Sequence, residues 1–331
     1  MMSPVSPSLD QIRATIAPDL AAIDAVIRER LGSEVALINQ IAEYIIGAGG
    51  KRLRPALVAL TGKLAGAPAA HTQQMAAVIE FIHTATLLHD DVVDESALRR
   101  GRATANASFG NAASVLVGDF LYSRAFEMMV EVGSMPVMGV MAAATNVISE
   151  GEVLQLMNVG DADTSEEAYL RVVRYKTAKL FEAGCRVGAI LGHATAADEA
   201  ALADYGTHVG TAFQLIDDVL DYAGDNVETG KNVGDDLAEG KPTLPLIFVL
   251  KNGTPAQQKL IRAAIEQSEN ANVDEVLQAI RESGALDYAR AAAAREADLA
   301  RAALARYQGA GESVHRAALL ELCAFAVDRR Y

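Results

Sequence analysis

Two stretches of the sequence, LHDDVVDE and LIDDVLDY, each place three aspartates at the end of an apolar run. The aspartates are Asp90, Asp91 and Asp94 in the first stretch and Asp217, Asp218 and Asp221 in the second. On a helix, residues four positions apart share a face and lie about 6 Å apart along the axis. The first and last aspartates of each triplet therefore point the same way. Carboxylates clustered at the end of a buried helix are costly unless cations neutralise them.

The recurrence of this pattern predicts two helices that form two walls of one site. Mg²⁺ suits such a site because it prefers oxygen ligands and is typically held by one or two carboxylates together with substrate phosphates. We therefore expect a metal-bridged phosphate site at the mouth of an apolar cavity.

Two other interpretations of the triplets must be weighed. A single DDxxD motif is more often a solvated or capping cluster, although two copies at the ends of apolar helices are less expected by chance. A carboxylate-bridged di-iron site requires Glu-x-x-His pairs on its helices. Neither triplet contains such a pair, although His83 and His89 precede the first one.

The composition predicts a nearly all-α protein. Of the 331 residues, 51% are hydrophobic, which permits a large buried core. Alanine is abundant, good helix formers dominate, and few stretches alternate with a period of two residues. No shift in composition marks a boundary, so we expect a single domain over residues 1–331, with residues 1–8 disordered.

Helices are predicted in most of the chain between polar breaks. Their expected ranges are 10–31, 34–47, a helix with Pro55 in its first turn, 72–94, 112–132, 136–158, 165–192, 198–223, 242–252, 255–268, 273–284, 285–306 and 311–328. The segment RRGRATANASFGN is predicted to be a polar loop. Residues 224–241 form a Gly-rich loop that is too long for a simple connector, and such loops are usually functional.

Charge and hydropathy exclude several kinds of partner. The formal net charge of −14 argues against non-specific binding to nucleic acid or an anionic membrane. The N-terminal stretch MMSPVSPSLD lacks the pattern of a signal peptide, and no apolar run reaches the ~18 residues that span a bilayer. Cys185 and Cys323 fit no CxxC pattern and are expected to be free thiols. We expect a soluble, cytoplasmic protein without an integral membrane segment.

Basic residues accompany the acidic triplets. The GGKRLRP segment places Lys51, Arg52 and Arg54 at a Gly-Gly turn before a helix N-terminus, where backbone N–H groups favour anions. Further candidates for phosphate contacts are Arg99, Arg100 and Arg102 after the first triplet, Lys176 with Thr177 in RYKTAKLF, and Lys231 and Lys241 after the second triplet. With Mg²⁺ and a local basic pocket, even an acidic chain can hold a polyphosphate.

Taken together, five motifs resemble those of the trans-type polyprenyl diphosphate synthases. They are GGKRLRP, LLHDDVVDESALRRGRATAN, YKTA, GTAFQLIDDVLDY and GKNVGDDLAEGKPTLPL, in the order of that family. The matches extend from about residue 30 to the C-terminus, and the paired aspartate motifs with GGKRxRP are highly specific. The sequence around them is most similar to the long-chain branch, which makes octaprenyl to decaprenyl diphosphate for quinone side chains.

The resemblance implies a fold, an activity and a set of roles. It implies an all-α isoprenoid-synthase-type bundle around a deep central cavity, a homodimer, and about three Mg²⁺ ions per site. The implied activity is successive 1′-4 condensation of isopentenyl diphosphate onto geranyl or farnesyl diphosphate, giving a product of about C40 to C50. The implied metal site comprises Asp90, Asp94 and Asp217, with Asp221 nearby. The implied contacts to the allylic diphosphate are Arg99, Lys176, Lys231 and Lys241, and those to isopentenyl diphosphate are Lys51, Arg54, His83 and Arg100. Thr177 and Gln214 are implied to face the reacting carbon.

Product length depends on an apolar tunnel beneath the metals. Short-chain relatives carry bulky aromatic residues four or five positions before the first aspartate, where this chain has Thr86 and Ala85. These small residues imply a long product. A helical wheel places Thr86 near the Asp90 face but Ala85 well off it. Met128, Met129 and Met157 are candidates for the floor of the tunnel, and we expect Met128 to form it.

Three rival functions remain. A terpene cyclase also ionises an allylic diphosphate at a DDxxD helix, but it usually replaces the second DDxxD and needs no second diphosphate pocket such as GGKRLRP. A non-catalytic subunit of a heteromeric synthase tends to lose acidic triplets, and both are intact here. A structural helical protein with solvated aspartates is the third.

Overall fold

A computed structural model of the chain describes residues 9–47, 50–99, 101–223, 234–268, 271–309 and 313–329. Nearly all of these residues are helical, which confirms the all-α prediction. The predicted disorder of residues 1–8 concerns a part of the chain outside the described residues.

The helices are, in chain order, α1 (Leu9–Thr15), α2 (Ala17–Arg30), α3 (Ala36–Ile46), α4 (Leu53–Ala65), α5 (Ala69–Val93), α6 (Ala105–Phe109), α7 (Asn111–Val132), α8 (Met135–Asn158), α9 (Glu166–Val172), the π-helical turn η1 (Val173–Ala178), α10 (Lys179–Leu191), α11 (Ala196–Ala223), α13 (Asp235–Ala238), α14 (Leu244–Asn252), α15 (Pro255–Glu266), α16 (Val273–Ser283), α17 (Ala285–Ala305) and α18 (Val314–Asp328). Two short strands, β1 (Leu98–Arg99) and β2 (Arg102–Ala103), pair antiparallel.

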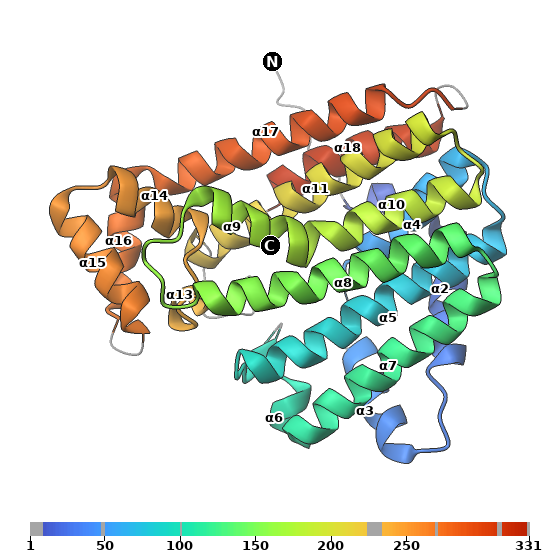
Figure 1. The fold of residues 1–331 in the computed structure, drawn as a ribbon, viewed down its shortest axis with the longest axis horizontal. Coiled ribbons are helices and arrows are strands. Elements are labelled where there is room, and N and C mark those ends of the chain that lie inside the picture. Colours follow the sequence, from blue (N-terminus) through green and yellow to red (C-terminus); the bar gives the residue numbers. More distant parts are fainter. Residues whose placement is uncertain are drawn as a thin grey trace.

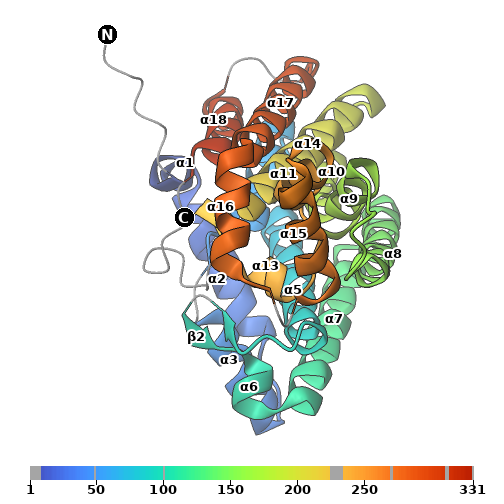
Figure 2. The same cartoon turned by 90° about the vertical axis from the view of Figure 1, so that its left-hand side faces the viewer.

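The longest helices form a bundle whose axes run in similar directions (Figure 1). Helix α11 packs against α10 and α17, and α5 packs against α7 and α4. Helices α14, α15 and α16 gather at one end of the bundle, with the short α13 beside them (Figure 2). Both acidic triplets are carried by long helices of the bundle: the first lies at the end of α5 and the second in the last turns of α11.

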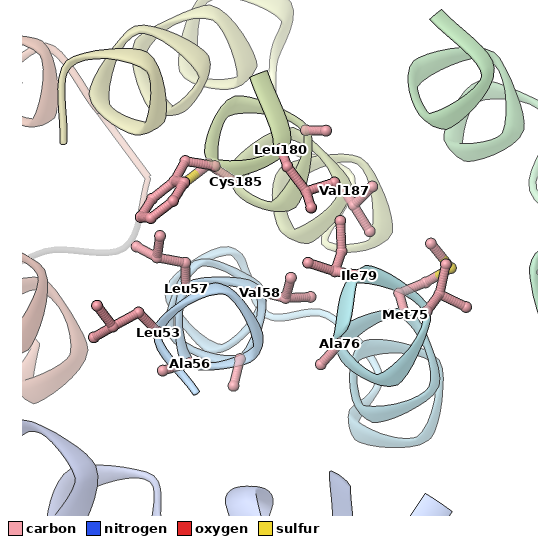
Figure 3. Close-up of a cluster of buried hydrophobic side chains, with 14 of the residues drawn as sticks. Leu53, Ala56, Leu57, Val58, Met75, Ala76, Ile79, Leu180, Cys185 and Val187 are labelled. Atoms are coloured by element: carbon pink, nitrogen blue, oxygen red, sulfur yellow. The ribbon is translucent and has the colours of Figure 1, made fainter. Parts of the chain in front are cut away.

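The core is continuous between α4, α5 and α10 (Figure 3). Val58 of α4 and Ile79 of α5 are completely buried there, as is Cys185 of α10. Burying a Val or Ile side chain contributes about 1.5–3 kcal/mol, so this packing fixes α5, and with it the first triplet, relative to α10. Both cysteines are free and buried, as expected.

Two predicted segments differ near the N-terminus and the first triplet. The helix expected over 10–31 is broken at Ile16, because Pro18 stands at the start of α2 and cannot donate a backbone hydrogen bond to the preceding turn. The segment expected to be a polar loop after Arg99 contains the β1–β2 pair and the short helix α6. Thr104 caps α6 by accepting a hydrogen bond from the N–H of Ala107.

The helix expected over 165–192 is also not continuous. It is divided by η1, a single π-helical stretch between α9 and α10. The long loop expected over 224–241 lies partly outside the described residues, and its described end contains α13. Within the described residues, no helix has the length and apolar character needed to cross a bilayer.

Candidate active site

Residues of both acidic triplets line one cavity of about 670 Å³: Asp90 and Asp94 of the first, and Asp217, Asp218 and Asp221 of the second. Its walls come from the start of α4, from α5, α8, η1 and α11, and from the segment around α13. The sequence-predicted residues that line it are Lys51, Arg54, His83, Thr86, Asp90, Asp94, Arg99, Lys176, Thr177, Gln214, Asp217, Asp221 and Lys241. Arg100 and Lys231 lie outside the described residues.

The aspartates on α5 are paired with lysines from other elements. The Nζ atom of Lys176 lies 3.4 Å from Asp90 Oδ2 and 2.5 Å from Glu152 Oε2 of α8. Lys241, which follows α13, donates to Asp94 Oδ2 at 2.8 Å. Burial raises the pKa of Asp90 although Lys176 opposes the shift, and burial likewise raises the pKa of Glu152 to about 7. Lys176 and Lys241 thus stabilise neighbouring carboxylates whose negative charge would otherwise be costly to bury.

The middle aspartate of the first triplet has a different partner. Asp91 is 4% exposed and accepts hydrogen bonds from Nε and Nη2 of Arg99, at 2.9 and 2.6 Å. The side chain of Asn106 donates to the Asp91 carbonyl oxygen at 3.0 Å, which ties α6 to the same point. Asp91 therefore fixes the side chain of Arg99, which extends from β1 to the cavity.

In the second triplet, Asp217 is paired with an arginine from the end of the chain. Arg329 donates from Nη1 to Asp217 Oδ1 at 2.9 Å and from Nη2 to the carbonyl oxygen of Phe213 at 2.5 Å. Its guanidinium carbon lies 3.7 Å from the centre of the Phe213 ring. The Arg329 side chain is only 3% exposed, so this contact places a buried cation against a predicted metal ligand.

A chain of hydrogen bonds connects the second triplet to the predicted reaction centre. Tyr169 of α9 donates to Asp218 Oδ2 at 2.5 Å, and the amide nitrogen of Gln214 donates to Asp218 Oδ1 at 2.7 Å. The hydroxyl of Thr177 donates to the amide oxygen of Gln214 at 2.9 Å. Burial, with a further contribution from Asp236, raises the pKa of Asp218 to about 8.

The π-helical turn η1 presents Lys176 and Thr177 to the cavity. Glycines on both neighbouring helices allow η1 to approach closely: a Cβ atom on Gly151 of α8 would lie 2.7 Å from the backbone nitrogen of Lys176. A Cβ atom on Gly210 of α11 would lie 2.7 Å from the Cα atom of Ala178. Single π-helical turns are frequent at functional sites. Here the two neighbouring helices contact the turn through glycines, which have no side chain.

Of the predicted isopentenyl diphosphate residues, the three that the structure describes, Lys51, Arg54 and His83, line the α4 side of the cavity. Arg54 Nη1 is 3.0 Å from His83 Nε2, and the guanidinium of Arg54 lies 4.6 Å from the centre of the Phe181 ring. Arg52, before α4, has a φ angle of 49°, which is unusual for a residue with a side chain. An ion pair between Arg52 and the buried Glu80 of α5 fixes this turn.

The predicted chain-length residues occupy different environments. Thr86 lines the cavity, whereas Ala85 is fully buried and is not among the lining residues, in agreement with the helical wheel. Met128 and Met129 are fully buried in α7 and do not line this cavity either. Met157 is 71% exposed, so its side chain lies on the surface of the chain and not at the base of an internal tunnel.

Several site residues escaped the sequence analysis. They are Glu80, Glu152, Tyr169, Glu239 and Arg329, all of which line the cavity. Glu152 and Tyr169 belong to ordinary helical stretches and had no local signal. Arg329 lies in the basic pair near the C-terminus, DRRY, which is the one cue that could have attracted attention.

The side chains present fit a hard divalent cation. Asp90, Asp94 and Asp217 offer only oxygen ligands, and each is neutralised by a lysine or arginine of the chain. Within the described part of the chain, no three His, Cys, Asp or Glu side chains are close enough to hold a metal by themselves. In Mg²⁺ sites, substrate phosphates commonly complete the coordination.

An all-α bundle that brings two acidic helix ends and several cations to one cavity defines an isoprenoid-synthase type of fold and site. A family model described as Polyprenyl synthetase matches residues 35–283, and the chain belongs to this family. The octaprenyl diphosphate synthase of Escherichia coli is 54% identical over 323 residues, which cover 97% of this chain and 99% of that protein.

Solved structures agree with this assignment. A polyprenyl synthase from Caulobacter crescentus, complexed with calcium and isoprenyl diphosphate, superposes with a TM-score of 0.95 at 46% identity, over 99% of this chain and 100% of that one. A decaprenyl diphosphate synthase from Rhodobacter capsulatus gives a TM-score of 0.90 at 43% identity, over 98% and 100% of the two chains. The family, the fold and the prenyltransferase class predicted from the sequence are confirmed.

Proposed function

We propose that this protein catalyses Mg²⁺-dependent, successive 1′-4 condensation of isopentenyl diphosphate onto an allylic diphosphate primer, and releases an all-trans product of about C40 to C50. The observation that carries the proposal is the shared cavity, which is lined by Asp90 of α5, by Asp94 at the C-cap of α5 and by Asp217 of α11. Relatives named octaprenyl and decaprenyl diphosphate synthase support a product in this range.

The cation–aspartate pairs suggest how the diphosphate is received. Lys176 and Lys241 hold Asp90 and Asp94, and both lysines line the cavity. Bound Mg²⁺, about three ions in the proposal, supplies the positive charge that neutralises the leaving diphosphate. The aspartates can then bind metal while the lysines, with Arg99, turn to phosphate oxygens. A solved relative complexed with calcium supports a divalent ion here.

The reaction follows from this arrangement. Neutralisation of the diphosphate allows the allylic C–O bond to break, and the closed pocket shields the resulting carbocation from water. Thr177 and Gln214 provide dipoles beside the cation. Arg54 and His83, with Lys51, hold isopentenyl diphosphate, whose double bond attacks the cation. The attack forms the new carbon–carbon bond and leaves a tertiary carbocation. The departing diphosphate accepts a proton from the carbon next to it, which forms the new double bond. The product is again allylic, so the cycle repeats.

The proposed homodimer is supported by an apolar stretch on the surface of α8. Val153, Leu156 and Met157 lie within five residues of one another and are 57%, 62% and 71% exposed. Isolated exposed apolar residues are ordinary, but a group on one helix indicates a surface that another chain covers. A role in supplying quinone side chains and a cytoplasmic location also remain proposals from the resemblance.

The test is incorporation of labelled isopentenyl diphosphate into a farnesyl or geranyl diphosphate primer by the purified protein, with chromatography of the dephosphorylated products. We expect Mg²⁺-dependent products of about C40 to C50. Asp90→Asn and Asp217→Asn should each reduce the rate by about 10²-fold or more, because they remove charge from the proposed metal site. Asp274→Asn on α16, whose side chain does not line the cavity, is the matched control. Conversion of the primer to a cyclic hydrocarbon without incorporation of label would instead indicate a terpene cyclase.

A further inference from the structure

The hydrogen bonds between Tyr169 and Thr177 converge on Asp218. Asp218 accepts from the phenol of Tyr169 at one oxygen and from the amide nitrogen of Gln214 at the other. With its nitrogen committed to Asp218, Gln214 can offer only its carbonyl oxygen to Thr177. Thr177 must therefore donate its single hydroxyl proton to Gln214, at 2.9 Å.

This order decides what Thr177 presents to the substrate. Its hydroxyl hydrogen is occupied within the protein, so the oxygen faces the cavity with its lone pairs and acts as an acceptor. The opposite order would turn the hydrogen towards the cavity and place a positive dipole beside a carbocation. The chain ends on the carboxyl group of Asp218, and hydrogen bonds in such a chain polarise one another, which increases the negative character of the Thr177 oxygen.

Tyr169 anchors this chain of groups. Its side chain is 6% exposed and donates to Asp218 at 2.5 Å, from α9, an element that carries none of the predicted site residues. Burial together with the nearby Asp218 raises the pKa of Tyr169 well above its usual value, so the phenol keeps its proton. Asp218 is thereby held on both sides, with Tyr169 fixing one oxygen and leaving the other for Gln214.

We propose that Tyr169 is a positioning residue for carbocation stabilisation: through Asp218 it orients the amide of Gln214, so that the lone pairs of Thr177 face the reacting carbon. The inference rests on the proposed function, since it concerns the cation formed in that reaction. Tyr169 does not touch the substrate in this role. Its effect should therefore appear in the rate of ionisation and not in substrate affinity.

The experiment compares the wild type with Tyr169→Phe, which retains the ring and removes the hydroxyl. Two allylic diphosphate analogues are used as probes with Mg²⁺ in titration calorimetry: an ammonium analogue that carries positive charge at the reacting centre, and an uncharged thiolo analogue. We expect Tyr169→Phe to weaken binding of the ammonium analogue about 5- to 10-fold and that of the thiolo analogue less than about 2-fold. In turnover, kcat should fall by a similar factor with KM unchanged.

Tyr288→Phe is the matched control. Tyr288 donates to the carboxylate of Glu166, at 2.9 and 3.0 Å, so this variant also removes a tyrosine–carboxylate hydrogen bond that anchors α9, but away from the cavity. It should leave both analogues and kcat unchanged. Equal weakening of both analogues by Tyr169→Phe would show a purely structural role and overturn the inference. A lower melting temperature together with weaker binding of both analogues would do the same.

A double-mutant cycle adds an independent readout. Thr177→Val removes the hydroxyl at the end of the chain, whereas Thr177→Ser retains it. If Tyr169 acts through Thr177, Tyr169→Phe should have little further effect on the ammonium analogue in the Thr177→Val background, and its usual effect in the Thr177→Ser background. Additive effects would overturn the inference. If the wild type incorporates no labelled isopentenyl diphosphate, it is the proposed function that fails.

Discussion

Arg329 Nη1 lies 2.9 Å from Asp217 Oδ1, so a residue near the C-terminus occupies the side of a predicted metal ligand. The guanidinium also stacks on Phe213, and its Nε atom is buried without a hydrogen-bond partner among the described residues. The cation is thus held at some cost in polar satisfaction, next to a carboxylate that a metal ion is expected to claim. We therefore predict that Arg329 and a metal ion compete for Asp217.

Arg329→Gln should tighten binding of Mn²⁺ or Mg²⁺ to the protein without substrate. Because the carboxylate of Asp217 is partly exposed, the pair is worth about 0.2–1 kcal/mol, and the gain in affinity should be at most about fivefold. Mn²⁺ binding followed by electron paramagnetic resonance measures it. Arg306→Gln, which breaks an ion pair with Asp204 away from the cavity, should have no effect. Unchanged or weaker metal binding by Arg329→Gln would show that no such competition exists.

Thr86→Phe should shorten the product by one or more isoprene units. Thr86 lines the cavity one helical turn before Asp90, so an aromatic ring there obstructs the path of the growing chain. Ala85→Phe is also predicted to shorten the product, but it should in addition cost about 1–3 kcal/mol of stability because Ala85 is fully buried. Chromatography of the products decides the matter. A Thr86→Phe enzyme with the wild-type product distribution would refute the proposed path.

Met128→Ala should lengthen the product if Met128 forms the floor of the tunnel. The side chain of Gln74 on α5 donates to the Met128 carbonyl oxygen, which places Met128 beside a residue 16 positions before Asp90, about 24 Å along the helix. The lost packing should cost about 2–5 kcal/mol. Met129→Ala removes an equally buried side chain on another face of α7. If Met128→Ala and Met129→Ala give products of the same length, Met128 does not form the floor of the tunnel.

Gly151→Ala should impair both stability and turnover. The new Cβ atom would press on the backbone of η1 at Lys176, at a cost of about 1–3 kcal/mol, and would displace Lys176 and Thr177. Gly139→Ala, on the same helix α8, has nothing within 4 Å of its Cβ position and should stabilise the protein by up to about 1 kcal/mol. Thermal unfolding and kcat distinguish them. If both variants behave alike, the close approach of α8 to η1 has no importance.

Leu156→Glu should convert the proposed dimer to a monomer in size-exclusion chromatography with light scattering, since a charge on this apolar stretch opposes burial by a second chain. Leu299→Glu, on a 48% exposed residue of α17, makes the same change on another helix and should leave the mass unchanged. A monomeric wild-type protein would contradict the proposed dimer. A Leu156→Glu protein that is still dimeric would show that the interface lies elsewhere.

The parts of the site that could be predicted from the sequence are those with a local pattern. The DDxxD triplets and GGKRLRP carry their chemistry within a few residues, and the end of α5 follows from the apolar run before Asp90. Arg329 could not be found this way, because its partner Asp217 is 112 positions away and the contact exists only after α18 has packed. The π-helical turn was also missed, since hydrophobic periodicity does not resolve one inserted residue within a long helical segment.

Three ion pairs have a consequence for how the newly synthesised chain folds. They join Asp90 to Lys176, Asp94 to Lys241 and Asp217 to Arg329. Many metalloproteins acquire their shape only when the ion arrives. This polypeptide carries internal counterions at all three carboxylates, so it can complete its architecture beforehand. We therefore predict that Mg²⁺ binds together with the substrate, and that a chelator removes it without unfolding the enzyme.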